Sequence, residues 1–425
     1  MAEKKIDYRE VLKESGYRKL LVSTMINRFG DSLDAVAFTW LVYQVTHSGT
    51  WSAIIFGMNI LPNVIIQPFA GAVVERLDKK RVIVFTHFLR GLLLIGFLAV
   101  YLSGHINGWM MAGFTFAVTS IEAFNMPAGT AFIPKVIKKE LLTHGMSLNT
   151  MMSGMVTLVG TGIAGVLIAK AGLYSVMIID IVTFFIAALI IMTIRCEKDT
   201  EETPGIKKES YLTTLKEGFR YIKSESLIMN YCIIAVMLNM ILVPINALQA
   251  PLVSECYKMG SELLSVLGMA GSVGAILGSA MIPMIRKKLT VKKTIVAFSL
   301  LLGLGIVALP IFGGLENDLV KYILGGTCFV IMTLAAGLIS GVINIEFVTN
   351  VDQKYIARSS AVFVSLATAS IPVTSMIVGW VKTFLSTSTL IMICGIGTVI
   401  FTIILILLNP KLDKEKEKIY AAETV

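Results

Sequence analysis

The sequence predicts an all-α membrane protein with twelve transmembrane helices in two six-helix halves. Apolar residues make up 55% of the 425 residues and charged residues only 15%, whereas a soluble chain of this kind carries roughly 25% charged residues. The apolar residues gather in long runs, and a helix needs about 20 of them to cross a bilayer. Turns or charge clusters separate most of these runs.

Twelve such runs follow one another along the chain. They are expected near residues 20–46, 51–75, 82–103, 108–132, 141–170, 173–194, 227–254, 260–285, 291–313, 319–346, 356–384 and 387–408. The weakest separations fall at Ala171–Gly172 and at a short break near Ser386.

The basic residues predict the orientation of the chain. When both termini and alternate loops are assigned to one side, that side receives most of the 37 Lys and Arg residues. The opposite side receives only Lys170, Lys258, Lys321 and Lys382. By the positive-inside rule both termini are cytoplasmic. The formal net charge of +9 is then explained by topology, and no nucleic-acid partner is expected.

The longest loop divides the spans six and six. The predicted units are a cytoplasmic tail (1–19), an N-terminal bundle (20–194), a linker (195–226), a C-terminal bundle (227–408) and a second cytoplasmic tail (409–425). The later part of the linker places its apolar residues on one helical face beside basic ones, which predicts an amphipathic helix at the cytoplasmic interface.

Six ionisable residues lie inside the spans of the first half. They are Arg28, Asp31, Asp34, Arg90, Glu122 and Asp180. A charged residue costs about 2.5–3.5 kcal/mol near the bilayer centre on insertion scales, and such residues usually mark a transport pathway. Burial disfavours a charged carboxylate, and the arginines are too few to neutralise every acid. A carboxylate that alternates between buried and wet surroundings would supply proton coupling without a cofactor.

The spacing within the first span suggests pairings. Asn27, Asp31, Asp34 and Phe38 share one helical stripe, and Arg28 can pair with Asp31 three residues on. Arg28, Arg90 and Asp180 are therefore candidates for buried ion pairs, with Asp180 expected to tie helices together. A purely structural ion-pair network is the alternative for these charges.

Polar and aromatic residues within the spans are candidates for a substrate cavity. They are Asn27, Phe38, Asn125, Asn239, Asn246, Gln249, Asn344 and Glu346. Hydrogen bonding between helices is an equal alternative for the amides of the seventh span. His87 can join a proton relay or pack as a neutral imidazole.

The sequence carries no Walker-type phosphate loop, zinc-binding pair or nucleophile motif. Its five cysteines are scattered without metal-site spacing. The prediction is therefore neither an enzyme nor an ATP-driven pump, with no metal and no bound cofactor.

One loop carries a family resemblance. Gly71, Glu75, Arg76, Lys79, Lys80 and Arg81 resemble the G-x-x-x-D-R-x-G-R-[KR] loop of the major facilitator superfamily. Glu75 replaces the usual Asp, and Asp78 stands where a second Gly is usual.

Further stretches resemble the macrolide-efflux branch of the drug:proton antiporters. They are Asn27–Leu33, Leu41–Gly49, Arg90, Asn125–Ile137 and Glu217–Leu227, within a likeness that runs from about Arg18 to Pro410. The fifth span departs from the antiporter motif, because Gly160–Gly165 reads GTGIAG where the family has a Gly-Pro pair.

The resemblance implies a monomeric transporter of the cell membrane that exports amphipathic, macrolide-like drugs by alternating access in exchange for protons. It also implies that the loop from Gly71 to Arg81 is a conformational switch. In the family the first, fourth, seventh and tenth spans line the cavity, which favours Asp31, Asp34 and Glu122 as the proton-coupling residues.

Two other functions remain open from the sequence. One is a lipid or lysolipid translocase or an uptake symporter, which would prefer amphiphiles already in the bilayer. The other is a membrane scaffold or sensor without transport, although a scaffold would not require six costly buried ionisable groups.

Overall fold

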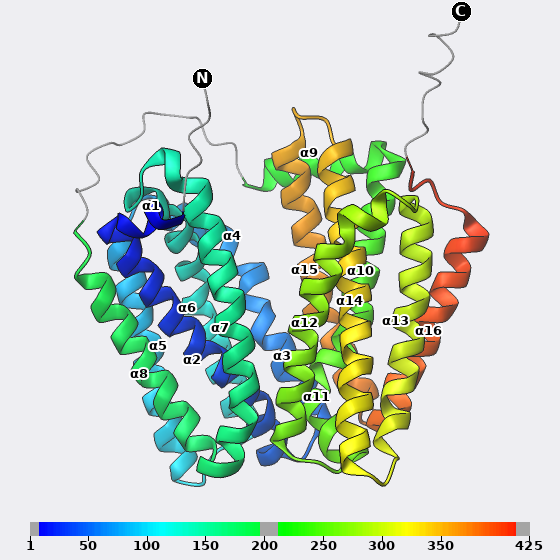
Figure 1. The fold of residues 1–425 in the computed structure, drawn as a ribbon, viewed down its shortest axis with the longest axis horizontal. Helices are drawn as coiled ribbons and strands as arrows, with labels where there is room; N and C mark the ends of the chain where they lie inside the picture. Colours follow the sequence, from blue (N-terminus) through cyan, green and yellow to red (C-terminus); the bar gives the residue numbers. More distant parts are fainter. Residues whose placement is uncertain (1–7, 196–210, 414–425) are drawn as a thin grey trace, which may run out of the picture.

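The computed structural model describes residues 8–195 and 211–413, and this part of the chain is helical and contains no strand. Its helices form two groups that stand side by side, one from α1–α8 and one from α9–α16 (Figure 1). The start of the predicted N-terminal tail (1–7), the first part of the predicted linker (196–210) and most of the predicted C-terminal tail (414–425) lie outside the described residues.

The N-terminal half contains α1–α8. Its elements are α1 (Tyr8–Lys13), α2 (Ser15–Thr46), α3 (Gly49–Ile65), α4 (Gln67–Glu75), α5 (Lys79–Leu102), α6 (Gly108–Phe132), the 3₁₀ turns η1 (Ile133–Lys135) and η2 (Lys139–Leu141), α7 (Leu142–Ala171) and α8 (Leu173–Met192).

The C-terminal half contains α9–α16. Its elements are α9 (Tyr211–Ser224), α10 (Ser226–Ala247), α11 (Gln249–Pro251), the π-helical segment η3 (Leu252–Tyr257), α12 (Ser261–Arg286), α13 (Val291–Gly313), α14 (Asp318–Asn350), α15 (Ile356–Val381) and α16 (Thr387–Leu408).

The helix lengths confirm the predicted fold class. Among the described residues, nine helices are long and apolar enough to cross a membrane, and the bent pair α3–α4 makes a tenth. The two remaining spans are α2, in which three charged residues interrupt the apolar run, and α6, which carries Glu122 and Asn125. Each half therefore contributes six spans.

The turns between spans follow from local backbone chemistry. Gly172 joins α7 to α8 with a φ of +81°, a conformation that glycine adopts without strain. This resolves one of the weak separations in the sequence. The second predicted span is instead broken, because α3 and α4 meet at a bend of 40° just before Pro68, which supplies no backbone N–H to continue the helix.

The two halves touch at one end of the molecule. We call the end that carries Tyr8 and Asp413 the terminal side and the opposite end the closed side. Near the closed side, the Gly165 N–H donates to Ser265 Oγ at 2.5 Å, and Ser375 Oγ donates to the Ala53 carbonyl at 2.5 Å. These contacts join α7 to α12 and α3 to α15.

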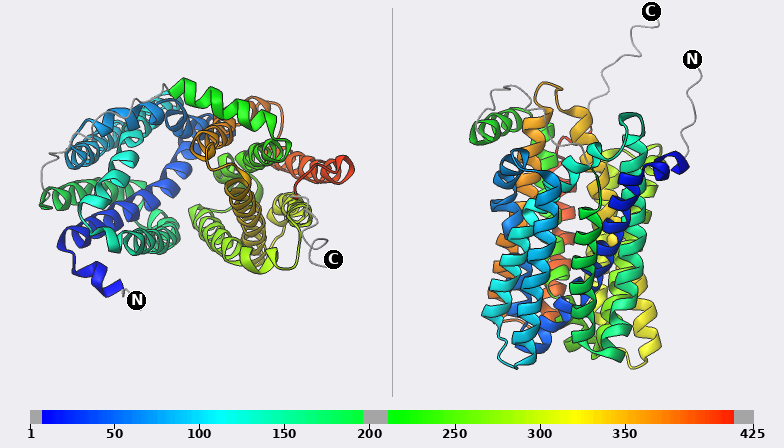
Figure 2. Two further views of the ribbon diagram at one scale, coloured as in Figure 1. Left: turned by 90° about the horizontal axis from the view of Figure 1, so that it is seen from above. Right: turned by 90° about the vertical axis from the view of Figure 1, so that its left-hand side faces the viewer.

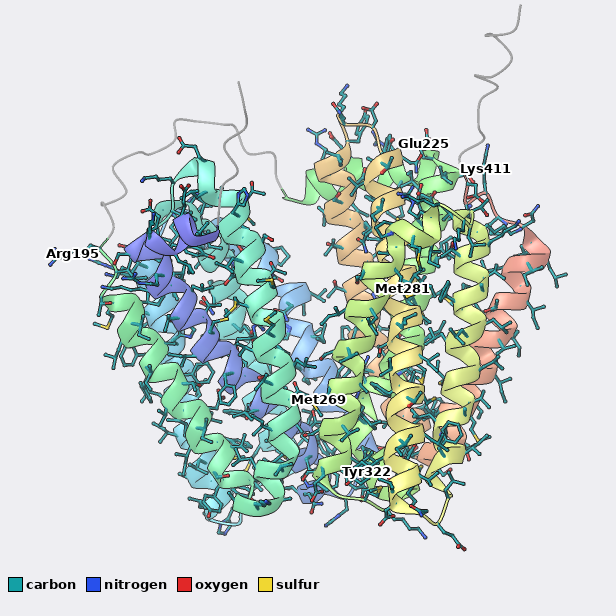
Figure 3. The ribbon with its side chains drawn as sticks, in the orientation of Figure 1. Arg195, Glu225, Met269, Met281, Tyr322 and Lys411 are labelled. Carbon is teal, nitrogen blue, oxygen red and sulfur yellow. The ribbon has the colours of Figure 1, made fainter. Side chains whose placement is uncertain are left out.

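Small residues permit this close approach. A Cβ on Gly165 would overlap the Ser261 backbone, and one on Gly162 would overlap the side chain of Met269, which lies where α12 faces α7 (Figure 3). Small residues commonly let membrane helices pack backbone to backbone. Toward the terminal side, the ribbons of the two halves diverge (Figures 1 and 2).

The amphipathic helix of the linker is α9, which lies across the terminal side of the C-terminal half (Figure 2). The Tyr221 ring stacks on Tyr355 at 4.6 Å, and the Tyr221 hydroxyl accepts from the Asp352 N–H at 3.0 Å. Glu217 forms an ion pair with Arg358. The helix is therefore fastened to the loop between α14 and α15 and to the start of α15.

Candidate functional site

The charges of the N-terminal half converge on Arg90 of α5. Its Nη2 lies 3.0 Å from Oδ1 of Asp31 on α2 and 3.7 Å from Oε2 of Glu122 on α6. The Arg90 guanidinium also lies 4.4 Å from the centre of the Phe184 ring on α8. The Arg90 side chain is only 8% exposed, whereas that of Glu122 is 45% exposed. One buried cation thus joins four helices and is shared by two carboxylates in different surroundings.

The predicted pairing of Arg28 with Asp31 is wrong. Asp31 accepts from Arg90 and, at 2.7 Å, from Asn27 Nδ2, whereas Arg28 is exposed and has no ion pair with any described residue. The reason is geometric, because Arg28 projects from a face of α2 next to the one that carries Asn27 and Asp31. Arg28 is therefore not a buried ion-pair residue.

Asp34 and Asp180 lie deeper in the same half. Oδ1 of Asp34 is buried and has no hydrogen-bond partner among the described residues. Asp180 is 2% exposed and accepts from Thr183 Oγ1 at 3.2 Å. A Cβ on Gly30 would overlap both Asp180 and Thr183, so α2 and α8 pack tightly at this point. Asp180 thus lies at a helix contact, whereas Asp34 presents an unsatisfied acceptor.

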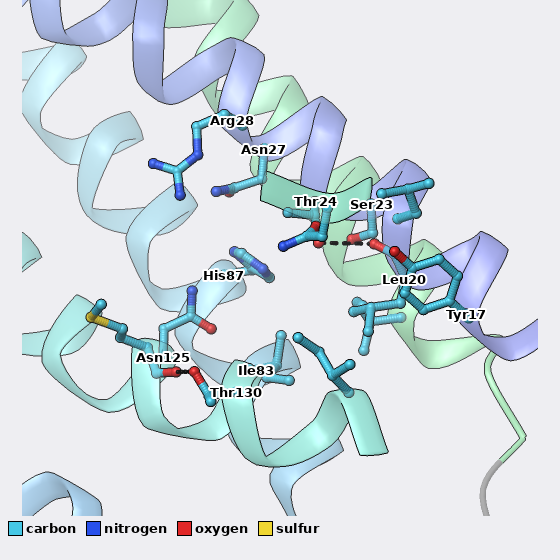
Figure 4. Close-up of a pocket in the computed structure, with 16 residues that line it drawn as sticks. Tyr17, Leu20, Ser23, Thr24, Asn27, Arg28, Ile83, His87, Asn125 and Thr130 are labelled. Carbon is cyan, nitrogen blue, oxygen red and sulfur yellow. Dashed lines mark hydrogen bonds between the residues drawn. The ribbon is translucent and has the colours of Figure 1, made fainter. Parts of the chain in front are cut away.

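A cavity of about 220 Å³ opens on the terminal side of Arg90, within the N-terminal half. We call it the N-half cavity. Arg28 and Asn27 of α2, His87 of α5 and Asn125 of α6 surround it (Figure 4). His87 is 5% exposed, and its Nδ1 has no partner among the described residues. The predicted cavity residues Asn27 and Asn125 therefore do line a cavity, with Arg28 and His87 beside them.

The second half does not extend this cavity. Asn239 donates to the Ala367 carbonyl at 2.9 Å and so ties α10 to α15, and Asn344 donates to the Ser340 carbonyl at 2.8 Å within its own helix. Glu346 is 7% exposed and pairs with Arg286. Asn239 and Glu346 thus make contacts that join helices, the alternative left open for the amides of the seventh span, and a cavity role for either residue stays a prediction.

The remaining residues predicted to line a substrate cavity lie in different surroundings. Phe38 packs against Phe97 and Phe114, with ring centres 5.8 and 6.0 Å apart, in an apolar cluster of the N-terminal half. Asn246 is exposed at the end of α10, and Gln249 is half-buried in α11. Neither of these two amides belongs to the N-half cavity.

The predicted switch loop connects α4 to α5. Asp78 Oδ1 accepts from the Arg81 N–H at 3.1 Å and caps α5, and Lys79 Nζ donates to the Glu75 carbonyl at 2.8 Å. Lys80 Nζ donates to the carbonyls of Met192 and Ile194 at 2.8 and 2.7 Å. The loop therefore anchors the end of α8. A Cβ added at Gly71 would point into open space, and Arg76 is exposed where α4 ends.

The structure adds a group that sequence reasoning missed, on the closed side. Glu255 of η3 accepts from Tyr43 of α2 at 3.2 Å, from Thr387 of α16 at 2.6 Å and from Lys382 at 3.5 Å. Glu255 thus joins the two halves. The sequence signal that could have identified Glu255 is its place close to Lys258, one of the few lysines assigned to the outer side.

No metal centre is evident in the described part of the chain, where no group of three or more His, Cys, Asp or Glu side chains is arranged to hold a metal ion. The polar groups present at the candidate site are the carboxylates around Arg90 together with Arg28, His87 and the neighbouring amides.

The comparisons with known proteins agree with this architecture. A family model described as a transmembrane secretion effector matches residues 10–423. Relatives include the uncharacterized MFS-type transporter YfiS of Bacillus subtilis strain 168 (24% identical; 79% of this chain, 78% of YfiS). Others are the multidrug efflux pump Tap of Mycolicibacterium fortuitum (23%; 85% and 87%) and macrolide efflux protein A of Enterococcus faecalis (21%; 76% and 99%).

Solved structures share the fold at low identity. The nucleoside transporter NupG superposes with a TM-score of 0.74 at 12% identity, over 93% of this chain and 99% of NupG. A bacterial homologue of the lysosomal transporter Spinster gives a TM-score of 0.67 at 10% identity, over 96% and 97% of the chains. Together with twelve spans in two halves, the family match shows that this chain belongs to the transmembrane secretion effector family of major facilitator transporters.

Proposed function

We propose that this transporter is a proton-coupled exporter of amphipathic compounds, macrolide-like drugs among them. It works by alternating access as a monomer in the cell membrane, with both termini in the cytoplasm. The observation that carries the proposal is that Arg90 is shared by Asp31 and Glu122 while Asp34 keeps a buried, unsatisfied oxygen.

Charge balance gives the coupling step. Arg90 neutralises one carboxylate at hydrogen-bond distance and leaves the others in excess. Burial disfavours charged carboxylates, so the excess acids take up protons when the helices close around them and release them when water returns. Glu122, at 45% exposure against 19% for Asp31, is the more accessible of the two carboxylates that contact Arg90. The proton gradient is the energy source, and no cofactor takes part.

The shape of the molecule supports entry of substrate from the terminal side. The halves meet on the closed side and diverge on the terminal side (Figure 1), which the positive-inside rule assigns to the cytoplasm. This arrangement suits uptake of substrate from the cytoplasm or inner leaflet. The efflux activity named for Tap and macrolide efflux protein A supports the same direction.

Transport in proteoliposomes with an imposed pH gradient tests the proposal, using a panel of macrolides, other amphipathic drugs and lysolipids. Asp34→Asn, Asp31→Asn and Glu122→Gln, singly and combined, are expected to abolish gradient-driven accumulation. Downhill exchange of substrate should persist in Asp34→Asn, because the substrate path is left intact.

Glu225→Gln provides the control, since it removes an exposed carboxylate on the terminal side and should leave accumulation unchanged. If the combined variant still accumulates drug in proportion to the pH gradient, these carboxylates do not couple protons to transport. If no member of the panel moves in the unaltered protein, the exporter assignment itself fails.

A further inference from the structure

The N-half cavity has an unusual charge balance for a half that is rich in buried acids. None of the 16 residues that line it is acidic, whereas Arg28 and His87 are both present (Figure 4). Arg28 is exposed and forms no ion pair within the described residues. A guanidinium that has no protein carboxylate offers its donors to a ligand.

The hydrogen-bonding groups of the cavity wall also favour a ligand that accepts hydrogen bonds. The hydroxyls of Ser23, Thr24 and Thr130 already donate to backbone carbonyls at 2.9, 2.9 and 3.1 Å. Asn125 Oδ1 accepts from Thr86 at 3.4 Å, which leaves its Nδ2 as an uncommitted donor. Arg28 and Asn125 therefore face one another across the cavity with donors that nothing else in the described chain uses.

The two acids that contact Arg90, Asp31 and Glu122, do not line the cavity. Asp31 lies one turn from Asn27 on α2, but its two oxygens accept from Arg90 at 3.0 Å and from Asn27 at 2.7 Å. Its charge is thus already paired, and the Asn27 amide stands between it and the cavity. The unpaired charge at the cavity wall is that of Arg28.

The size of the cavity limits what it holds. At about 220 Å³ it has room for roughly seven water molecules at ~30 Å³ each, and drug-sized ligands need pockets of about 300–1,000 Å³. Leu20, Leu21 and Ile83 also contribute apolar surface to its wall. It suits a compact oxyanion together with the first carbons of a chain.

We infer that the N-half cavity is an anion subsite, in which Arg28 and Asn125 bind the carboxylate or phosphate head group of an amphipathic substrate whose tail lies between the two halves. The inference rests on the proposed transport function. It adds to that function a preference, among amphipathic compounds, for those with an anionic head group.

The test measures binding without any gradient, on the full chain in phosphatidylcholine nanodiscs. The ligands share a twelve-carbon chain and differ in head group: dodecyl phosphate, lauroyl sarcosinate, dodecyltrimethylammonium and dodecyl maltoside. Apparent affinities come from the concentration dependence of the thermal unfolding temperature. The two anionic ligands are expected to bind at least about tenfold more tightly than the cationic one, since charge-assisted hydrogen bonds are the stronger kind.

Variants assign the preference to the cavity. Arg28→Gln is expected to remove it, Arg28→Lys to keep part of it, and Asn125→Asp to weaken dodecyl phosphate binding while still accepting from Thr86. Arg220→Gln is the matched control, because it removes the same charge from an exposed site on α9 in the other half, and it should retain the preference.

Three results would overturn the inference: equal or tighter binding of dodecyltrimethylammonium, an unchanged order of ligands in Arg28→Gln, or inorganic phosphate alone binding as tightly as dodecyl phosphate. The last result would identify a free-anion site in place of an amphiphile subsite. Because no proton gradient is used, a failure here leaves the proton-coupling proposal standing, and a failure of proton coupling leaves the head-group preference measurable.

Discussion

At the scale of single residues, the buried position of Arg90 explains how α2, α5, α6 and α8 tolerate several acids in a membrane. Its guanidinium contacts Asp31, Glu122 and the face of Phe184, so its charge is balanced and one of its planar faces is covered. Breaking a buried pair by removing one partner leaves the other charge uncompensated.

Arg90→Gln is therefore expected to destabilise the protein by about 3–5 kcal/mol, read as a lower thermal unfolding temperature in detergent. The double variant Arg90→Gln with Asp31→Asn should recover part of this loss, because it removes the stranded charge as well. Arg220→Gln, on an exposed surface, should change stability little. Equal stability of Arg90→Gln and the unaltered protein would show that the cluster is not a structural pair.

The sequence identified polar residues that lie at the candidate site, but it did not identify which of them form pairs. Asn27 and Asn125 do line a cavity, but this cavity lies within the N-terminal half, and a substrate-binding role for either residue stays a prediction. The sequence assigned Arg28 to Asp31 because only contacts along one helix are readable from spacing. The actual partner, Arg90, is close only after α2 and α5 have packed, and spacing along the chain carries no information on that rotation.

At the scale of elements, the end of α8 depends on the loop between α4 and α5. The last carbonyls of a helix have no intrahelical partner, and Lys80 Nζ donates to that of Met192 and to the carbonyl of Ile194 just beyond the helix. A cation at this end is also favoured by the helix dipole. The loop thus has a stabilising role beside the switching role implied by the family resemblance.

Lys80→Ala is expected to fray the last turn of α8, at a cost of about 0.5–1 kcal/mol, seen as faster amide hydrogen exchange in that turn. Arg81→Ala is a suitable comparison, because the Arg81 side chain is 86% exposed and its nearest carboxylate atom lies 3.8 Å away. It should leave exchange in α8 unaltered. Similar exchange in the two variants would mean that Lys80 does not cap α8.

Element boundaries were predicted well where one residue, such as Gly172, determines the turn, and less well elsewhere. The α7–α8 junction at Gly172 was expected, and the positive φ found there explains it. The break between α3 and α4 was missed, because Pro62 and Pro68 both interrupt one apolar run and the bend occurs beside only one of them. The function of Glu255 was hidden for a related reason, since η3 brings it to α2 only in the assembled molecule.

At the scale of the whole molecule, the closed side is held by few polar contacts and by close backbone packing. The Glu255 carboxylate is the centre of the polar part, with Tyr43 across the junction and Thr387 and Lys382 within its own half. The rest is glycine and serine contact between α7 and α12 and between α3 and α15. Losing Glu255 should therefore favour opening on this side.

Glu255→Gln is expected to shift the population away from the observed state by about fivefold, which corresponds to about 1 kcal/mol for one such hydrogen bond. Spin labels at Glu140→Cys and Lys287→Cys, with the native cysteines replaced, report the distance between the halves on the terminal side. A shorter distance should become more populated in Glu255→Gln. Glu316→Gln, an exposed acid in the loop before α14, is the control, and identical distance distributions in both variants would contradict the role of Glu255.

The N-half cavity has a thermodynamic consequence, because every residue that lines it belongs to the N-terminal half. In the proposed alternating-access cycle its walls belong to one moving unit, so a head group bound there would be held equally well in both conformations. A ligand with equal affinity for two states shifts no population between them. The cavity can therefore determine which molecules are carried. The free-energy difference that favours one conformation over the other must come from contacts of the substrate tail with the C-terminal half or from proton binding.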